Sequence, residues 1–337
     1  MPDVRSLAQR KLSVVAPCFN EGSGLREFVR RTKAVCSGVL CSSYEIVLVN
    51  DGSRDETLAL ALELAAADSS IRVVNLLRNF GHQAAATAGL DLATGDVVVL
   101  IDADLQDPPE VIAEMVGHWT RGADVAYGLR RSRRGESTLK LVSAKIFYRV
   151  LGRLAKTRIP SDTGDFRLMD RRIVEALRQM RERHRFIRGM VSWVGGTQVA
   201  VGYDRQPRFA GETKYPLRKM ISFAVDAITS FSVVPLRLVT YLALTIIVLA
   251  VLATATVFVV KLLNPGYFIP GFPATMLTII FFGGVQLLAL GVIGEYIGRM
   301  YESVKARPIY LVEGIYQTDG QGRALVTGQP SSSETTS

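Results

Sequence analysis

Short apolar runs alternate with amphipathic segments along the first 121 residues of the chain. Four continuous runs rich in Val, Ile and Leu are predicted to be strands buried on both faces: residues 12–17, 44–49, 71–76 and 97–101. A helix is predicted after each strand, the second with Ser53 as its N-cap: residues 25–36, 56–67, 82–93 and 109–121. This alternation predicts an α/β fold with a doubly wound, mostly parallel sheet.

The most informative polar cluster follows the fourth strand, in the sequence IDADLQDPPE (101–110). Asp102 and Asp104 are one residue apart, and Gln106 is two residues further on. Carboxylate and amide oxygens are hard ligands that suit Mg²⁺ or Mn²⁺, and such an ion usually keeps several waters and holds a substrate diphosphate. A strand that ends in a polar turn is the simpler interpretation of a bare Asp-x-Asp, and the rest of the chain decides against it.

Three further polar clusters are expected at strand ends. Asn20 and Glu21 follow the first strand, Asp51 follows the second, and Asp165 lies at a later one. Because the carboxyl ends of consecutive parallel strands share one edge of a sheet, the clusters after the first, second and fourth strands are expected to converge on a crevice. Its expected partner is a nucleotide diphosphate. No GxGxxG follows the first strand, so a dinucleotide-binding Rossmann site lacks support.

Two long apolar segments near the C-terminus predict membrane spans. Residues 238–260 and 262–294 contain no charged side chain, and a helix needs about 20 apolar residues to cross a bilayer. We expect spans near residues 237–261 and 273–295, which form a two-span hairpin over residues 236–298. Buried helices of a soluble protein are the alternative, but two adjacent segments of this length disfavour it. No secretory signal is predicted at the N-terminus.

The distribution of charge supports a membrane-bound protein with cytoplasmic ends. Basic residues precede the first span and follow the second, so the positive-inside rule predicts an outward-facing tip. Ten of the 29 residues from 130 to 158 are Lys or Arg, and residues 138–157 are predicted to form a basic helix on the membrane surface. A second amphipathic helix is expected over residues 217–235. The net charge of +9 therefore points to anionic lipid headgroups rather than to nucleic acid.

Several motifs together resemble a known enzyme family. PCFNE (17–21), VNDGSRDET (49–57), RNFGHQAA (78–85) and IDADLQDPPE (101–110) resemble the inverting family 2 glycosyltransferases of the GT-A fold. YGLRRSRRGES (127–137), DTGDFRLMD (162–170) and RFAGETKYPL (208–217) narrow the resemblance to the polyisoprenyl-phosphate glycosyltransferases. This group includes the dolichol-phosphate-mannose synthase-like enzymes and a bacterial undecaprenyl-phosphate glucosyltransferase branch. The resemblance covers residues 12–316.

The resemblance implies roles for individual residues. Five are implied in binding the nucleotide sugar, together with Asp102: Pro17, Asn20, Glu21, Asp51 and Gly81. Three are implied to hold Mg²⁺ or Mn²⁺: Asp102, Asp104 and Gln106. Four cations resemble positions that receive the phosphate of the lipid acceptor: Arg130, Lys145, Arg208 and Lys214. Asp165 is expected in the catalytic set with Asp102 and Asp104, where it contacts the sugar hydroxyls or orients the acceptor.

The implied activity is transfer of a hexose, with UDP-glucose as the favoured donor, to undecaprenyl phosphate. A phosphomonoester has a second pKa of about 6, so the acceptor is a nucleophile at neutral pH without a strong general base. GDP-mannose and a UDP-aminoarabinose derivative stay open as donors. A catalytically inactive scaffold or flippase partner is the alternative from another class, disfavoured by four intact residues: Asp102, Asp104, Gln106 and Asp51.

The expected location is the bacterial inner membrane, as a multi-pass protein with a cytoplasmic catalytic domain over residues 1–216. A cytoplasmic segment over residues 299–316 and a disordered tail over residues 317–337, rich in Ser, Thr, Gly and Gln, complete the expected organisation. Five glycines offer small helix faces for a homo-oligomer: Gly283, Gly284, Gly291, Gly294 and Gly298.

Overall fold

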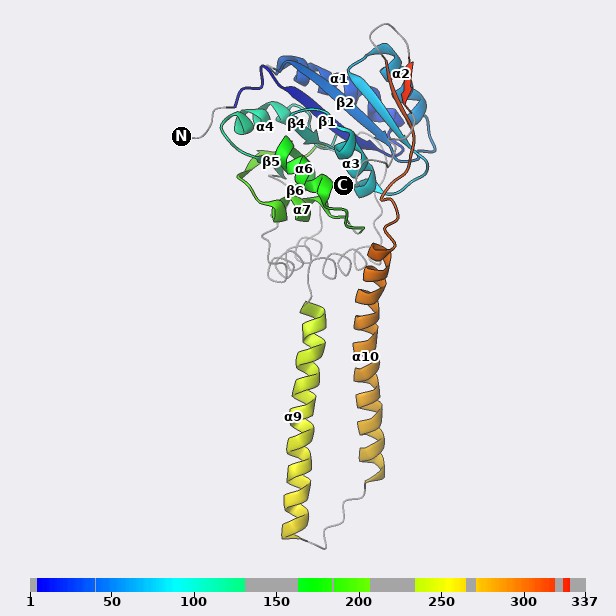
Figure 1. The fold of residues 1–337 in the computed structure, drawn as a ribbon. Helices are drawn as coiled ribbons and strands as arrows, with labels where there is room; N and C mark the ends of the chain where they lie inside the picture. Colours follow the sequence, from blue (N-terminus) through cyan, green and yellow to red (C-terminus); the bar gives the residue numbers. More distant parts are fainter. Residues whose placement is uncertain are drawn as a thin grey trace, which may run out of the picture. The chain divides into compact units, whose positions relative to one another are not determined.

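The computed structural model describes seven stretches of the chain: residues 5–39, 41–130, 163–183, 185–206, 234–264, 271–318 and 324–327. The chain divides into two units. The first contains residues 1–152, 157–215 and 308–337, and the second contains residues 153–156 and 216–307. Figure 1 shows the sheet of the first unit and the two long helices of the second.

The first unit is built on one mixed sheet. Within the described residues it has nine strands in the order β7-β5-β6-β4-β1-β2-β3-β8-β9. Their bounds are β1 (Lys11–Cys18), β2 (Ser43–Asn50), β3 (Ile71–Leu76), β4 (Val97–Leu100), β5 (Val125–Arg130), β6 (Thr163–Asp170), β7 (Gln198–Tyr203), β8 (Val312–Thr318) and β9 (Ala324–Thr327). The four predicted strands are confirmed as the parallel centre β4-β1-β2-β3.

Helices cover both faces of this sheet. Their bounds are α1 (Gly22–Gly38), α2 (Thr57–Ala67), α3 (His82–Leu92), α4 (Val111–Thr120), α6 (Arg171–Gln179) and α7 (Ile187–Val194). Side chains of α1, α2 and α4 form one buried core, and those of α3, α6 and α7 form the other. Val14 of β1 lies in the first core and Val15 in the second. Successive strand residues point to opposite faces, so a sheet covered on both sides requires continuous apolar strands.

Strand β6 enters the sheet between β4 and β5 and runs antiparallel to both. The β4–β6 register pairs Leu100 with Arg167. Continued by two residues beyond this pair, the same register places Asp165 opposite Asp102. Asp165 therefore lies at a strand end, near the start of β6. It reaches the edge where β4 ends because β6 runs in the opposite direction.

The start of α2 differs from the prediction. The helix begins at Thr57, and Glu56 occupies the N-cap position without a side-chain capping hydrogen bond. The predicted cap, Ser53, is wrong: its hydroxyl oxygen accepts the backbone N–H of Asn20 at 3.0 Å. Ser53 therefore joins the loops after β1 and β2 instead of closing a helix end.

The C-terminal part of the chain returns to the sheet of the first unit. Strand β8 pairs antiparallel with β3, and β9 pairs antiparallel with β8. A disordered tail from residue 317 is therefore wrong for residues 317–318 and 324–327, which lie in strands. The unit that contains the sheet consequently extends beyond the expected residues 1–216.

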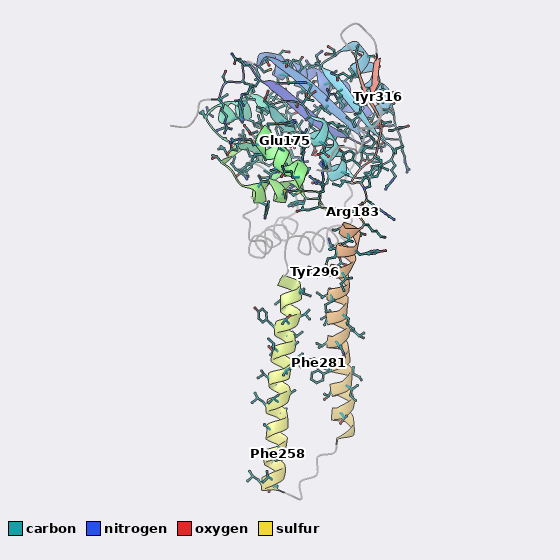
Figure 2. All side chains as sticks on the ribbon, in the orientation of Figure 1. Glu175, Arg183, Phe258, Phe281, Tyr296 and Tyr316 are labelled. Carbon is teal, nitrogen blue, oxygen red and sulfur yellow. The ribbon has the colours of Figure 1, made fainter. Side chains whose placement is uncertain are left out.

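The second unit contains the two predicted apolar helices, α9 (Val234–Leu263) and α10 (Phe272–Val304), which contact each other. The segments Leu238–Val260 and Thr278–Val304 are long and apolar enough to cross a membrane. Figure 2 shows side chains such as Phe258 and Phe281 standing out from these helices, and these two are 66% and 58% exposed. Such exposure of large apolar side chains over two whole helices supports membrane association. The predicted surface helix 138–157 and most of 217–235 lie outside the described residues.

Close packing of α3 on the sheet yields a stability prediction. A Cβ atom on Gly89 would collide with Val15 Cγ1 and lie 3.0 Å from Val49 Cγ2. Overpacking of this kind costs about 1–3 kcal/mol, so Gly89→Ala should lower the thermal unfolding midpoint of the purified full-length protein. Gly117→Ala is the matched control because its nearest neighbour would be Arg121 Nη1 at 3.9 Å. The control should be neutral or raise the midpoint, since Gly is unfavourable inside a helix. Equal shifts for both variants would contradict the packing argument.

Candidate active site

Two strands and one helix bring acidic and basic side chains together at one edge of the sheet. Asp102 follows β4, Asp165 lies near the start of β6, and His82 is the first residue of α3. The His82 Nε2 atom lies 3.2 Å from Asp165 Oδ2 and 3.5 Å from Asp102 Oδ1. Because all three side chains meet, we treat this cluster as the centre of the candidate site.

Asp165 is a buried anion held by several donors. Arg188 Nε donates to Oδ1 at 3.0 Å, and Gln83 Nε2 donates to Oδ2 at 2.9 Å. Burial alone raises the pKa of a carboxyl, but the charge of Arg188 and the hydrogen bond from His82 hold the pKa of Asp165 well below its usual range. Asp165 is therefore suited to holding neighbouring side chains and unsuited to accepting a proton.

His82 is a site residue that the sequence analysis did not single out, although it lies in the quoted RNFGHQAA motif. Burial lowers its pKa, but the hydrogen bond to Asp165 and the charge of Asp102 raise the pKa to about 9. The pKa of Asp102 is raised to about 6 by burial, against the opposing effect of His82. His82 therefore places a positive charge between two carboxylates.

The loop after β4 fits a divalent cation with two carboxylates. Asp102 Oδ1 is a buried atom without a hydrogen-bond partner among the described residues, and Asp104 Oδ1 accepts the backbone N–H of Gln106 at 3.0 Å. The loop holds Leu105 at a φ of 59°, a left-handed conformation that costs a non-glycine residue about 1–2 kcal/mol. Two carboxylates suit an ion that keeps most of its waters, as Mg²⁺ does.

The third implied metal ligand is engaged elsewhere in this structure. Gln106 Oε1 accepts a hydrogen bond from Arg205 Nη2. Within the described stretches, no group of three or more His, Cys, Asp or Glu side chains is arranged to hold a metal ion. Asp102 and Asp104 therefore remain the two candidate ligands without such an engagement, and Gln106 could join them only through the second lone pair of Oε1 or by leaving Arg205.

Four implied nucleotide-binding residues shape loops at the same edge. Asp51 accepts the backbone N–H groups of Phe80 and Gly81 at 2.7 and 3.0 Å. Asn20 Oδ1 accepts the N–H of Arg54 at 2.8 Å, and the N–H of Glu21 donates to Thr57 at 2.8 Å. The loops after β1, β2 and β3 are thus joined to one another. Pro17, the fifth, is buried inside β1.

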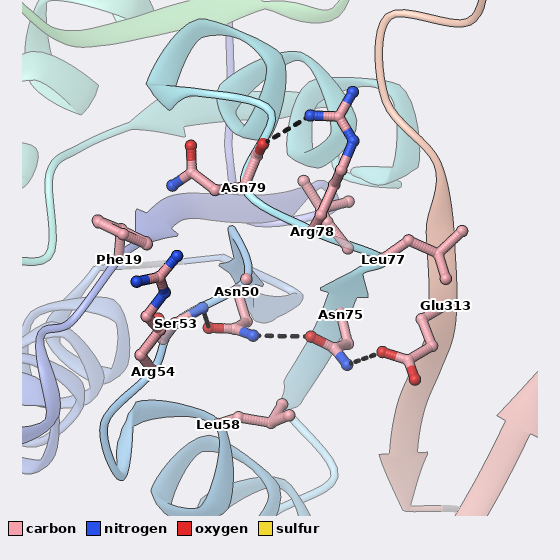
Figure 3. Close-up of a pocket in the computed structure, with 12 residues that line it drawn as sticks. Phe19, Asn50, Ser53, Arg54, Leu58, Asn75, Leu77, Arg78, Asn79 and Glu313 are labelled. Atoms are coloured by element: carbon pink, nitrogen blue, oxygen red, sulfur yellow. Dashed lines mark hydrogen bonds between the residues drawn. The ribbon is translucent and has the colours of Figure 1, made fainter.

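A cavity of about 620 Å³ adjoins these loops. Its lining combines apolar and polar side chains, shown in Figure 3: Phe19, Asn50, Gly52, Ser53, Arg54, Leu58, Asn75, Leu76, Leu77, Arg78, Asn79 and Glu313. Its volume lies in the usual range of small-molecule sites. The cavity is lined by both neighbours of Asp51 in the chain, Asn50 and Gly52, and not by Asp102, His82 or Asp165.

A second polar cluster surrounds Asp107, which is 1% exposed. The hydroxyl of Tyr203 donates to Asp107 Oδ1, and Arg130 Nε donates to the same hydroxyl at 3.3 Å. Arg130 Nη2 lies 3.7 Å from Asp107 Oδ2. Asp107 belongs to the same loop as Asp102, so the loop after β4 supplies the buried carboxylate that holds Arg130, the implied acceptor cation.

The other implied acceptor cations, Lys145, Arg208 and Lys214, lie outside the described residues. Trp193 is 69% exposed, so it does not belong to the core.

Comparisons with known proteins agree with this architecture. The model of the family described as "Glycosyl transferase family 2" matches residues 13–178. An uncharacterised glycosyltransferase of Synechocystis is 49% identical over 91% of this chain and 96% of its own length. The bactoprenol glucosyl transferase of Shigella phage SfII is 40% identical over 90% of this chain and 97% of its own.

Among solved structures, the glucosyl-3-phosphoglycerate synthase of Mycobacterium tuberculosis, with Mn²⁺, UDP and product, aligns with a TM-score of 0.42. The alignment has 22% identity over 65% of this chain and 78% of that one. The two relatives cover almost the whole chain at well over 30% identity, so the chain belongs to glycosyltransferase family 2. It is a glycosyltransferase of the bactoprenol glucosyltransferase type.

The buried Asp165 cluster yields a prediction for Asp165→Asn. Removing one charge of a buried pair costs about 3–5 kcal/mol because the partner stays uncompensated, so the variant should unfold at a lower temperature at pH 7. Since the folded pKa is depressed, the stabilisation is present above about pH 4 and is lost as the pH falls further. The difference in unfolding temperature between the wild type and the variant should therefore become smaller below pH 4. Asp204→Asn, at an exposed position, is the control. If the unfolding temperature of Asp165→Asn differed from that of the wild type by the same amount at every pH, the ionic explanation would be contradicted.

Proposed function

We propose that this chain transfers glucose from UDP-glucose to undecaprenyl phosphate and releases UDP. The relatives named bactoprenol glucosyl transferase support the sugar and the acceptor. The observation that carries the proposal is the meeting of Asp102, His82 and Asp165 at the sheet edge, in a unit whose loops after β1, β2 and β3 also line a cavity. That arrangement suits a donor whose diphosphate lies at the carboxylates and whose nucleoside lies in the cavity.

The donor is bound by residues of the loops after β1, β2, β3 and β4. Asp102 and Asp104 hold Mg²⁺ or Mn²⁺, and this ion, when bound, stabilises the negative charge of the leaving diphosphate. Asn20, Glu21, Asp51 and Gly81 shape the loops that border the nucleoside. Asp165, with its low pKa, keeps His82 beside Asp102 and takes no proton.

The acceptor side relies on guanidinium and ammonium groups. Arg130 is held by Tyr203 and Asp107 and binds the acceptor phosphate, assisted by Lys145, Arg208 and Lys214. A phosphate oxygen forms a bond to the anomeric carbon while the bond from that carbon to the UDP oxygen breaks, with inversion of configuration. The acceptor phosphate is ionised at neutral pH, so no general base is required.

The membrane helices serve the acceptor, whose phosphate lies at the headgroup level. A hairpin through the bacterial inner membrane confines the enzyme to that plane and reduces the encounter with the lipid to two dimensions. The basic residues that flank the apolar segments support a cytoplasmic location of both ends. The glycine faces of α10 support a homo-oligomer.

The first test measures release of nucleoside diphosphate by the purified full-length protein in detergent. Undecaprenyl phosphate, Mg²⁺ or Mn²⁺, and either UDP-glucose or GDP-mannose are supplied. Lipid-dependent release of UDP supports the proposal. Release of GDP would show that the donor is GDP-mannose instead of UDP-glucose. If neither donor gives release, loss of nucleotide binding by calorimetry would favour the inactive scaffold, whereas intact binding would favour another donor such as the UDP-aminoarabinose derivative.

The metal assignment makes a specific prediction. Asp104→Ala should lower turnover by about 100-fold or more, because charge stabilisation on the leaving group is lost, and EDTA should have the same effect on the wild type. Membrane insertion, measured by fractionation, should not change. Glu114→Gln, an exposed carboxylate on α4, is the control and should keep wild-type turnover. Full activity of Asp104→Ala would remove the metal assignment.

A further inference from the structure

Strand β8 contributes an irregular residue to the cavity wall. The register of β8 on β3 pairs Asn75 with Gly314 and then Leu76 with Val312, with an irregularity between Asn75 and Leu76. Glu313 is therefore the extra residue of a β-bulge. Bulges commonly re-aim a side chain beside a functional site, and here Glu313 lines the cavity.

Glu313 begins a chain of hydrogen bonds that crosses the floor of the cavity (Figure 3). Glu313 Oε2 accepts from Asn75 Nδ2 at 2.7 Å, and Asn75 Oδ1 accepts from Asn50 Nδ2 at 2.7 Å. Asn50 Oδ1 accepts the backbone N–H of Ser53 at 3.3 Å. The chain thus links β8 to β3, to β2 and to the loop that carries Asp51.

The donor and acceptor roles along this series of hydrogen bonds are determined by the groups at its two ends. An ionised carboxylate only accepts hydrogen bonds, and a backbone N–H only donates. Asn50 and Asn75 are 2% and 5% exposed, and buried amides require partners. Glu313 therefore fixes which oxygen and which NH₂ group each amide presents along the cavity floor.

The remaining walls suit a flat ring. In the described part of the first unit, four large apolar side chains are exposed: Phe19, Leu77, Trp193 and Leu311. Two of them, Phe19 and Leu77, line this cavity. An aromatic and an aliphatic face beside a polar floor of fixed donors and acceptors match a heteroaromatic ring with a hydrogen-bonding edge.

We propose that Glu313 is a specificity-determining residue of the donor site, which fixes the amide pair Asn75–Asn50 against the base of the nucleoside diphosphate. The inference rests on the proposed function for the identity of the ligand. It assigns base selection to a strand that the chain forms only after its second apolar helix.

The test compares calorimetric affinities of the full-length protein for UDP and for GDP, in detergent with Mg²⁺. Glu313→Gln replaces an obligate acceptor by a group that also donates, so the amide pair loses its fixed direction. The expected result is a loss of UDP affinity of about 10-fold, a smaller ratio between the UDP and GDP affinities, and a raised KM for the donor with little change in kcat.

Gln317→Ala is the matched control. Gln317 lies on the same strand, bonds Arg72 of β3 at 3.0 Å and does not line the cavity. This variant should loosen β8 without changing the ratio of affinities. Equal effects of the two variants on UDP binding would overturn the inference, because β8 would then have only a structural role. Unchanged UDP and GDP affinities in Glu313→Gln would overturn it while leaving the transferase intact, whereas a wild type that binds neither nucleotide would overturn the proposed function as well.

Discussion

The structure depends on one constraint: strands covered by helices on both faces have little room for polar side chains away from their ends. The centre of the sheet, β4-β1-β2-β3, buries Val and Leu on both sides, so charged groups gather in the loops beyond the strands. Asp51 and Asp102 reach the same edge for this reason. The site is thus a consequence of how the core is packed, and the chemistry occupies the positions that packing leaves free.

Strand β6 changes what this edge contains. Because it runs against β4, a residue at its start arrives opposite the loop after β4, and Asp165 comes to lie beside His82 at 3.2 Å. A buried carboxylate of this kind needs donors on each oxygen, and Arg188 and Gln83 supply them. The resulting anion holds a positive His82 next to Asp102, so acidic groups that would repel one another share one site.

The two long apolar helices separate β8 and β9 from the other strands in the sequence, although all of these strands belong to one sheet. Residues 308–337 belong to the same unit as residues 1–152, and β8 covers the edge of β3. An uncovered edge strand exposes unpaired backbone groups, which gives a physical reason for the return. It also brings Glu313, which follows the two apolar helices in the sequence, into the lining of the cavity.

Local pattern in the sequence was enough to predict the parallel strands, the helices between them and the two apolar helices, because apolar periodicity reports burial directly. It also located Asp102 and Asp104, since they interrupt an apolar run. Only the tertiary structure decided the antiparallel insertion of β6, the pairing of β8 with β3, and the contacts of His82, Asp107 and Glu313. These depend on registers between segments far apart in the chain, and no local pattern records which distant residue will lie opposite.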